Sequence, residues 1–210
     1  MLSALGACGS SSTNNAGTKS NVIDPQGARS ASGFEGDAEG WTITGDAQAD
    51  HVKPDYSGTG GNPDGLISAV DDVTGGTWYF QAPDKYLGDA SAAYGNFLKF
   101  DLKTTDVSSP FDNFDVILSG AGKVLAFNTP NNPVVGSWTS YKIQLSETAG
   151  WAVIGAVGDT YPDDFATLPK PSQADFKAVL GNITQLLIRG EFNSGPDTGY
   201  LDNVRFGATQ

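Results

Sequence analysis

Carboxylates are the most numerous charged groups in this sequence, and four of them have positions that would suit a hard cation. Asp and Glu total 24 residues against 12 Lys and Arg, which gives a formal charge of −12. Ca²⁺ prefers oxygen ligands from carboxylates and carbonyls. Glu35 and Asp37 lie near the start of the structured sequence and Asp202 near its end, with Asp72 as a further candidate. These carboxylates are candidate ligands for a structural calcium ion, with Glu35 and Asp202 foremost; the alternative is that Asp202 is an ordinary polar strand residue.

A second constellation has the composition of a sugar site. Sugars bind to an aromatic face and to polar groups that satisfy their hydroxyls. In an extended segment Trp78 and Phe80 share one face and Tyr79 points the other way, and Arg189 and Glu191 likewise share a face of a later segment. These four side chains predict a carbohydrate-binding surface. The alternative is that the two rings belong to the core and that Arg189 and Glu191 form a surface pair.

Catalysis has less support in the sequence. A glycosidase needs two carboxylates across a cleft, but no feature of the sequence selects such a pair. His51 is the one histidine, and the glycines at 58–61 precede Asn62-Pro63 and no helix, so they predict no phosphate-binding loop. The acidic charge also disfavours nucleic acid, because the phosphate backbone would be repelled. We therefore expect no enzyme and no nucleic-acid partner.

The first 32 residues have the composition of a lipoprotein leader and tether. Residues 5–8, Leu-Gly-Ala-Cys, resemble a bacterial lipobox, in which Cys8 would receive the lipid. Residues 9–32 are rich in Ser, Thr, Asn, Gly and Ala, a composition typical of flexible tethers. We predict a tether over 1–32, a folded domain over 33–210, and an extracytoplasmic protein. It would be a bacterial outer-membrane or cell-surface lipoprotein, or a secreted protein, and would reach the membrane only through its lipid anchor.

Short β-rich segments between turn residues dominate the rest of the chain. The predicted strands are 41–44, 66–69, 77–81, 97–102, 114–119, 124–128, 140–144, 186–192 and 201–206. Alternation in 97–102 places Lys99 and Asp101 on the face opposite to the apolar residues. One helix is predicted after Ser172, where Asp175 follows at the spacing of a capping box. Many short strands with one amphipathic helix indicate an all-β jelly-roll sandwich.

Several blocks of the sequence also resemble a known family. They are TWYFQAPDKYLGD (77–89), SAAYG (91–95), LKFDL (98–102), WTSY (138–141), LSE (145–147), DFKAVLGNITQLLIRGEF (175–192) and LDNV (201–204). In this order they resemble laminin IV type A domains, also called laminin B domains. The resemblance implies a jelly-roll sandwich related to galactose-binding and carbohydrate-binding modules, whose first and last strands lie together and often hold calcium between them.

The resemblance further implies a non-catalytic binding module. We expect an adhesion or carbohydrate-binding module whose partner is a glycan or an extracellular matrix or surface polymer. The alternative is a structural protein that assembles with itself in a matrix. Exposure of Trp78 and Arg189 would favour a ligand site, whereas burial of Trp78 against Phe100 would favour a scaffold.

Overall fold

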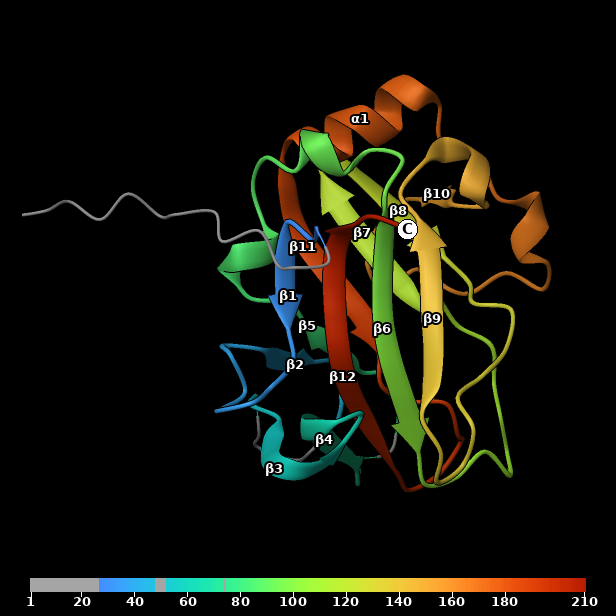
Figure 1. Ribbon diagram of the computed structural model, residues 1–210. Helices are drawn as coiled ribbons and strands as arrows, with labels where there is room; N and C mark the ends of the chain where they lie inside the picture. The colour runs from blue at the N-terminus through green and yellow to red at the C-terminus, as the bar shows by residue number, and fades with distance from the viewer. Residues whose placement is uncertain (1–26, 48–51, 74) are drawn as a thin grey trace, which may run out of the picture.

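A computed structural model describes residues 27–47, 52–73 and 75–210 of the 210-residue chain. Two six-stranded sheets pack face to face and one short helix covers one end of the sandwich (Figure 1). Pairing between neighbouring strands is antiparallel throughout. The predicted β-sandwich with one short helix is therefore confirmed. Cys8 and His51 lie outside the described residues.

The front sheet, the one that faces the viewer in Figure 1, is built around the last strand of the chain. Its order is β3-β4-β12-β6-β9, and β1 pairs with the upper part of β12. The strands are β1 (Ser30–Ser32), β3 (Asp55–Gly61), β4 (Asp64–Asp71), β6 (Phe97–Thr104), β9 (Thr139–Gln144) and β12 (Asp197–Ala208). First and last strands therefore lie side by side, as the resemblance implies.

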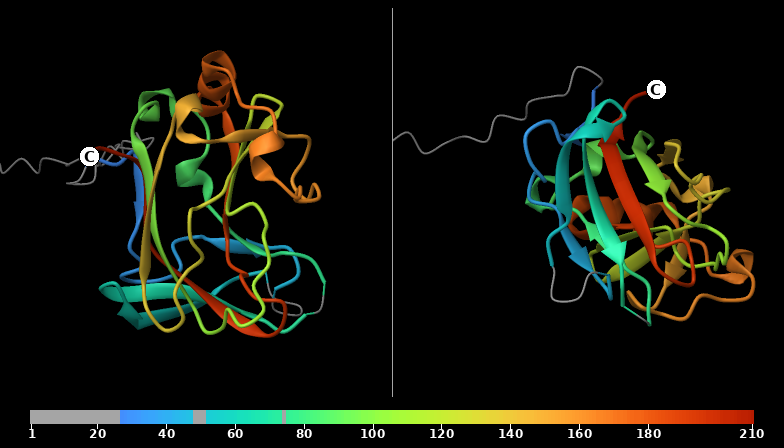
Figure 2. Two further views of the ribbon diagram at one scale, coloured as in Figure 1. Left: turned by 90° about the vertical axis from the view of Figure 1, so that its right-hand side faces the viewer. Right: turned by 90° about the horizontal axis from the view of Figure 1, so that it is seen from below.

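The back sheet has the order β10-β8-β7-β11-β5-β2. Its strands are β2 (Thr42–Thr44), β5 (Tyr79–Gln81), β7 (Val116–Gly120), β8 (Lys123–Phe127), β10 (Ala152–Ile154) and β11 (Ile183–Arg189). Figure 2 shows the two layers from the side, with the β3–β4 hairpin at the end opposite to the helix. Four short 3₁₀ turns occupy the connections, at Asp84–Tyr86, Ser91–Ala93, Glu147–Ala149 and Phe165–Thr167.

The helix α1 (Gln173–Gly181) has the predicted capping box. The Ser172 hydroxyl accepts the Asp175 N–H, and the Asp175 side chain accepts the Ser172 N–H, which satisfies two of the free donors at the helix start. Phe176, Val179 and Leu180 are buried, so the apolar side of the predicted amphipathic helix faces the sandwich.

The ordered fold begins before the predicted boundary at residue 33, because Ser30–Ser32 form β1. This strand contains no large apolar residue, so hydrophobic alternation could not identify it. Its inward side chains are held by polar contacts instead: Ser32 Oγ accepts the Trp41 Nε1–H at 2.9 Å and lies 2.9 Å from the Tyr86 hydroxyl.

Two apolar clusters fill the fold. The main core lies between the sheets and includes the three buried tryptophans Trp41, Trp78 and Trp151. A second cluster lies on the outer face of the back sheet, where Tyr161, Phe165 and Leu168 pack over it. The segment that contains these three residues therefore covers part of the outer face of the back sheet.

Candidate ligand-binding site

The aromatic pair predicted to bind sugar lies in the core. Trp78 and Phe80 have no exposed surface and pack edge to face with ring centroids 5.0 Å apart. A Cβ at Gly190 would lie 1.9 Å from the Trp78 ring, so the strand can pass there only with glycine. Both side chains belong to the main core, and Tyr79 belongs to the second cluster on the other face. The shared face is as predicted, but these rings present no surface to a sugar.

Arg189 is also buried, and its partner is Asp115 rather than Glu191. Arg189 Nη1 lies 3.2 Å from Asp115 Oδ1, and Nη2 donates to the Phe111 carbonyl at 2.7 Å. The guanidinium packs between the rings of Phe111 and Phe192 at 4.4 and 4.5 Å. Burial raises the pKa of the Asp115 carboxyl, while the Arg189 charge favours its ionised form. The arrangement is an internal ion pair, and it makes no surface available to a ligand.

Glu191 lines a pocket that we call the acid pocket. It measures about 550 Å³ and is lined by Asp71, Asp72, Val73, Gly75, Gly76, Thr77, Phe111, Glu191, Ser194, Gly195 and Pro196. Glu191 Oε2 accepts the Trp78 backbone N–H at 3.3 Å. Burial raises the pKa of Glu191 to about 8, and the Asp71 carboxylate adds to the rise. Near neutral pH a protonated Glu191 can therefore donate to Asp71.

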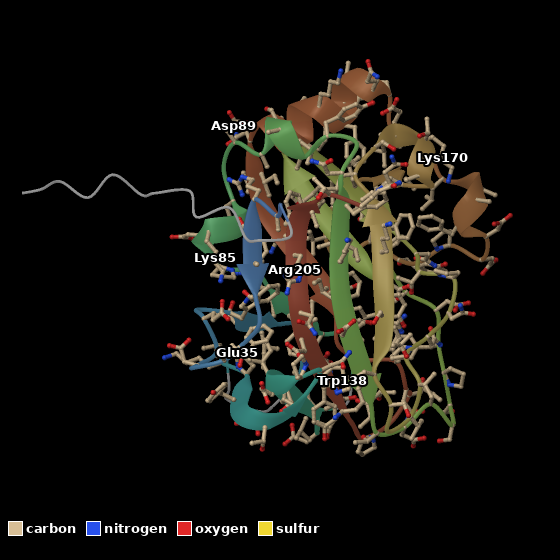
Figure 3. All side chains as sticks on the ribbon, viewed as in Figure 1. Glu35, Lys85, Asp89, Trp138, Lys170 and Arg205 are labelled. Atoms are coloured by element: carbon tan, nitrogen blue, oxygen red, sulfur yellow. The ribbon has the colours of Figure 1, made fainter. Side chains whose placement is uncertain are left out.

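The structure places only two of the four predicted calcium ligands near each other. Asp202 is fully buried, and its oxygens accept the backbone N–H groups of Asn62 and Asn203, each at 2.6 Å. Burial raises the pKa of Asp202 to about 6, and the charges of Asp101 and Glu35 contribute to the rise. Glu35 is exposed beside the β3–β4 hairpin (Figure 3).

Asp37 and Asp72 lie elsewhere. Asp37 accepts the Glu39 N–H at 2.6 Å within its own turn, and Asp72 lines the acid pocket. No three Asp, Glu, His or Cys side chains in the described part of the chain converge as metal ligands. The donors around Asp202 are nevertheless oxygens of the kind that calcium prefers, since the Asp101 carboxylate lies opposite it in the neighbouring strand.

The outer face of the front sheet carries a cluster that the sequence reasoning missed. The Lys103 ammonium lies 4.5 Å from the ring centroids of both Trp138 and Tyr200. Trp138 Nε1 donates to the Gly60 carbonyl at 3.3 Å, and Lys103 Nζ lies 3.4 Å from the same oxygen. Both rings are partly exposed, so together they offer a polar aromatic surface to solvent.

A shallow groove continues this face along β6. It measures about 320 Å³ and is lined by Lys99, Phe100, Asp101, Ser140, Tyr141, Lys142, Asn203 and Arg205. Figure 3 shows Trp138 and Arg205 at different heights on the face of the front sheet that is turned toward the viewer. The turn of the β3–β4 hairpin contacts both parts of this face, because the Gly60 carbonyl accepts from Trp138 and Lys103 and the Asn62 side chain donates to Asp101 in the groove.

The family profile described as laminin B (domain IV) matches residues 79–210, which is more than half of the chain. The chain belongs to the laminin B (domain IV) family. It is 32% identical over 126 residues to laminin subunit gamma-1 of Danio rerio and 29% identical over 145 residues to the laminin-like protein lam-2 of Caenorhabditis elegans. These alignments cover 60% and 66% of this chain but only 7% and 8% of the relatives.

A solved laminin structure has the same fold. The L4b domain of human laminin alpha-2 superposes with a TM-score of 0.61 at 16% identity, covering 85% of this chain and 96% of that one. The resemblance inferred from the sequence blocks is therefore confirmed. Within the described residues, the laminin B fold includes no helix that is long and apolar enough to cross a membrane.

Some signal for the missed surface was present in the laminin B sequence. Alternation in 97–102 already places Lys99 and Asp101 on the outward face, and the same period extends to Lys103. Trp138 comes directly before β9, which pairs with β6, so the register brings it to the Lys103 end of the face. The order of the strands in the sheet could not be predicted, because the paired strands β12 and β6 are almost one hundred residues apart in the sequence.

Proposed function

We propose that this domain is a non-catalytic, extracytoplasmic binding module and that the outer face of its front sheet binds carbohydrate. The observation that carries the proposal is the Trp138–Lys103–Tyr200 cluster beside the groove of β6 and β9. The rings supply apolar faces for the flat side of a sugar, and the groove supplies donors and acceptors for its hydroxyls.

The choice of this face follows from what covers the other one. Tyr161 and Phe165 stack on one another and pack on Phe114, over the back sheet. The front-sheet face instead exposes partly buried rings and long polar side chains. A flat sheet surface with aromatic groups suits an extended polymer better than a small molecule, which would be enclosed in a deeper cavity.

The non-catalytic part of the proposal rests on how the buried carboxylates are used. Asp115 is occupied by Arg189 and Thr129, and Glu191 by Asp71 and the Trp78 backbone. These contacts hold loops and strands together. In the acid pocket the Glu191 and Asp71 carboxyl groups are hydrogen-bonded to each other, whereas glycoside hydrolysis uses two carboxyl groups on either side of the scissile bond.

We propose in addition that one Ca²⁺ binds beside Asp202, with Glu35 as the second carboxylate. The support is that two chain ends, at β1 and β12, meet here and that the Asp202 and Asp101 carboxylates lie opposite each other in register. A cation would offset their repulsion. Calorimetric titration with Ca²⁺ should show binding by the wild type and none by Asp202→Asn; equal heats for both would exclude this site.

We also propose that the protein acts outside the cytoplasm, held by a lipid on Cys8 or secreted. The support is the sequence of the leader and tether, together with membership of the laminin B family. Cys8 itself lies outside the described residues. Expression with the native upstream sequence should place the wild type in the membrane fraction and release Cys8→Ser. Equal distribution of the two forms would exclude the lipid anchor.

A second candidate function is a self-assembling structural component, which the burial of Trp78 and Arg189 favours. Trp78 lies in the same core as Phe100, the arrangement expected of a scaffold. Val134 and Val135 are about half exposed, at 55% and 47%, and offer apolar surface for contacts between copies. Sedimentation velocity over a hundredfold range of concentration should show one species for a binding module and growing assemblies for a scaffold.

The carbohydrate proposal is tested by a glycan array with the wild type and Trp138→Ala. The wild type should bind at least one glycan class, and the variant should lose most of that signal while unfolding at nearly the same temperature. Phe127→Ala, which removes a partly buried ring that packs on Trp151 in the back sheet, is the control for loss of an aromatic side chain. Unchanged array signals for Trp138→Ala would exclude this face.

A further inference from the structure

Three basic side chains form a row across the front sheet. Arg205 of β12 lies opposite Lys99 of β6, and Lys99 lies opposite Lys142 of β9. All three line the same groove of about 320 Å³. Neighbouring strands lie roughly 4.8 Å apart, so the row extends about 10 Å across the strands. We call these three residues the basic row.

The basic row depends on an irregularity in β12. Between Asp202 and Arg205 the strand has one more residue than β6 has between Asp101 and Lys99. Asn203 takes up this extra residue with φ of 53°. Leu201 and Val204 both face the core, so the bulge restores the outward direction at Arg205. Without it, Arg205 would point into the sandwich.

Two of the three side chains also have contacts within the fold, because Lys99 Nζ donates to the Thr209 carbonyl at 2.9 Å and Lys142 Nζ lies 4.1 Å from the Phe97 ring centroid. Like charges directly opposite each other in a sheet destabilise it. Among the residues that line the groove, Asp101 has a carboxylate, and its Oδ2 accepts the side-chain amides of Asn62 and Asn203 at 3.0 and 2.8 Å. Three basic side chains thus face one carboxylate in the groove, and its lining carries a net positive charge.

The contrast with the rest of the chain is large. Lys99, Lys103, Lys142 and Arg205 are four of the 12 basic residues, in a chain whose formal charge is −12. These four basic residues lie on one face of the front sheet, although acidic residues outnumber basic ones two to one in the whole sequence. A local positive surface on an acidic protein attracts anions.

We propose that the ligand of this face is an acidic polysaccharide with one carboxylate on each sugar ring, a polyuronate. The proposal rests on the carbohydrate function above and names its ligand class. Successive rings would bring regularly spaced carboxylates to the row, and Arg205 can bind a carboxylate through two parallel hydrogen bonds. The Trp138–Tyr200 end lies four residues along β6, about 13 Å away, and receives the apolar face of a further ring.

The test is affinity electrophoresis of the full chain in gels that contain one of four polymers. They are polygalacturonate, its methyl-esterified form, dextran and dextran sulfate. Esterification keeps the sugar backbone and removes the charge. Polygalacturonate should retard the wild type most strongly, and added salt should weaken the effect. Lys99→Gln and Lys142→Gln should each weaken binding about tenfold, the loss of one charge-assisted contact.

Lys170→Gln is the matched control, because Lys170 packs on Phe165 of the cluster over the back sheet. It should bind like the wild type, and all variants should unfold at the wild-type temperature or above. Equal retardation by the esterified polymer, stronger retardation by dextran sulfate, or an equal loss in Lys170→Gln would overturn the polyuronate ligand. Retardation by neither charged nor neutral polymers would overturn the carbohydrate function itself.

Discussion

Replacement of Glu191 by glutamine should make the domain more stable at alkaline pH. The folded-state pKa of Glu191 is raised to about 8 from its ordinary value of 4.5, chiefly by burial and then by the Asp71 charge. Between these values the folded chain holds a proton that the unfolded chain releases. Stability from this group is therefore fully present below about pH 4.5 and is lost as the pH rises toward 8.

The size of the effect follows from the same linkage. One proton of difference changes the free energy of unfolding by about 1.4 kcal/mol for each pH unit, so the limit between pH 6 and 8 is roughly 3 kcal/mol. The pocket is open to water, which screens the charge, and we expect about half of that limit. The glutamine of Glu191→Gln would keep both contacts, since its amide can donate to Asp71 and accept the Trp78 N–H.

The assay is urea unfolding at pH 5, 6, 7 and 8, followed by tryptophan fluorescence. The stability of Glu191→Gln relative to the wild type should rise by about 1.5 kcal/mol between pH 6 and pH 8. The control is Glu147→Gln, because a hydrogen bond from Tyr94 lowers the pKa of Glu147 and so gives no loss at high pH. Parallel curves for Glu191→Gln and the wild type would show that the carboxyl is not protonated in the folded state.

Two further predictions concern the framework. Asp115→Ala leaves the buried Arg189 charge without its partner. It should lower the free energy of unfolding, measured by urea unfolding, by about 3–5 kcal/mol. A loss below about 1 kcal/mol would show that water reaches the guanidinium. Ser172→Ala removes the cap of α1 and should cost about 1 kcal/mol, whereas the neighbouring exposed Gln173→Ala should cost less; equal losses would mean that the cap contributes little.

Most of the strands could be predicted because their residues alternate or are rich in β-branched and aromatic types. All nine predicted strand segments correspond to strands of the fold, although those at 77–81 and 114–119 begin two residues early and that at 186–192 extends three residues past β11. The three strands that were not predicted lack this signal. β1 is Ser-Ala-Ser, β3 contains three glycines in seven residues, and β10 has three residues.

The site could be predicted only in part, because its residues come together through pairings distant in sequence. Outward exposure of Lys99 followed from alternation, but the position of Arg205 depends on the bulge at Asn203, which no local pattern indicates. Similarly, the pairing of Arg189 with Asp115 joins residues 74 positions apart. The prediction of a sugar site at Trp78 was wrong about its exposure. Alternation shows which side chains share a face of a strand, but it does not show whether that face packs against the other sheet.

Binding of the ligand to the front-sheet face can be tested by NMR chemical-shift mapping with a galacturonic acid oligosaccharide. We expect the largest shifts at Lys99, Lys103, Trp138, Lys142 and Arg205. Phe111 and Glu191 in the acid pocket should not respond. Shifts that gather around the acid pocket and leave the Trp138 indole unchanged would contradict binding at this face.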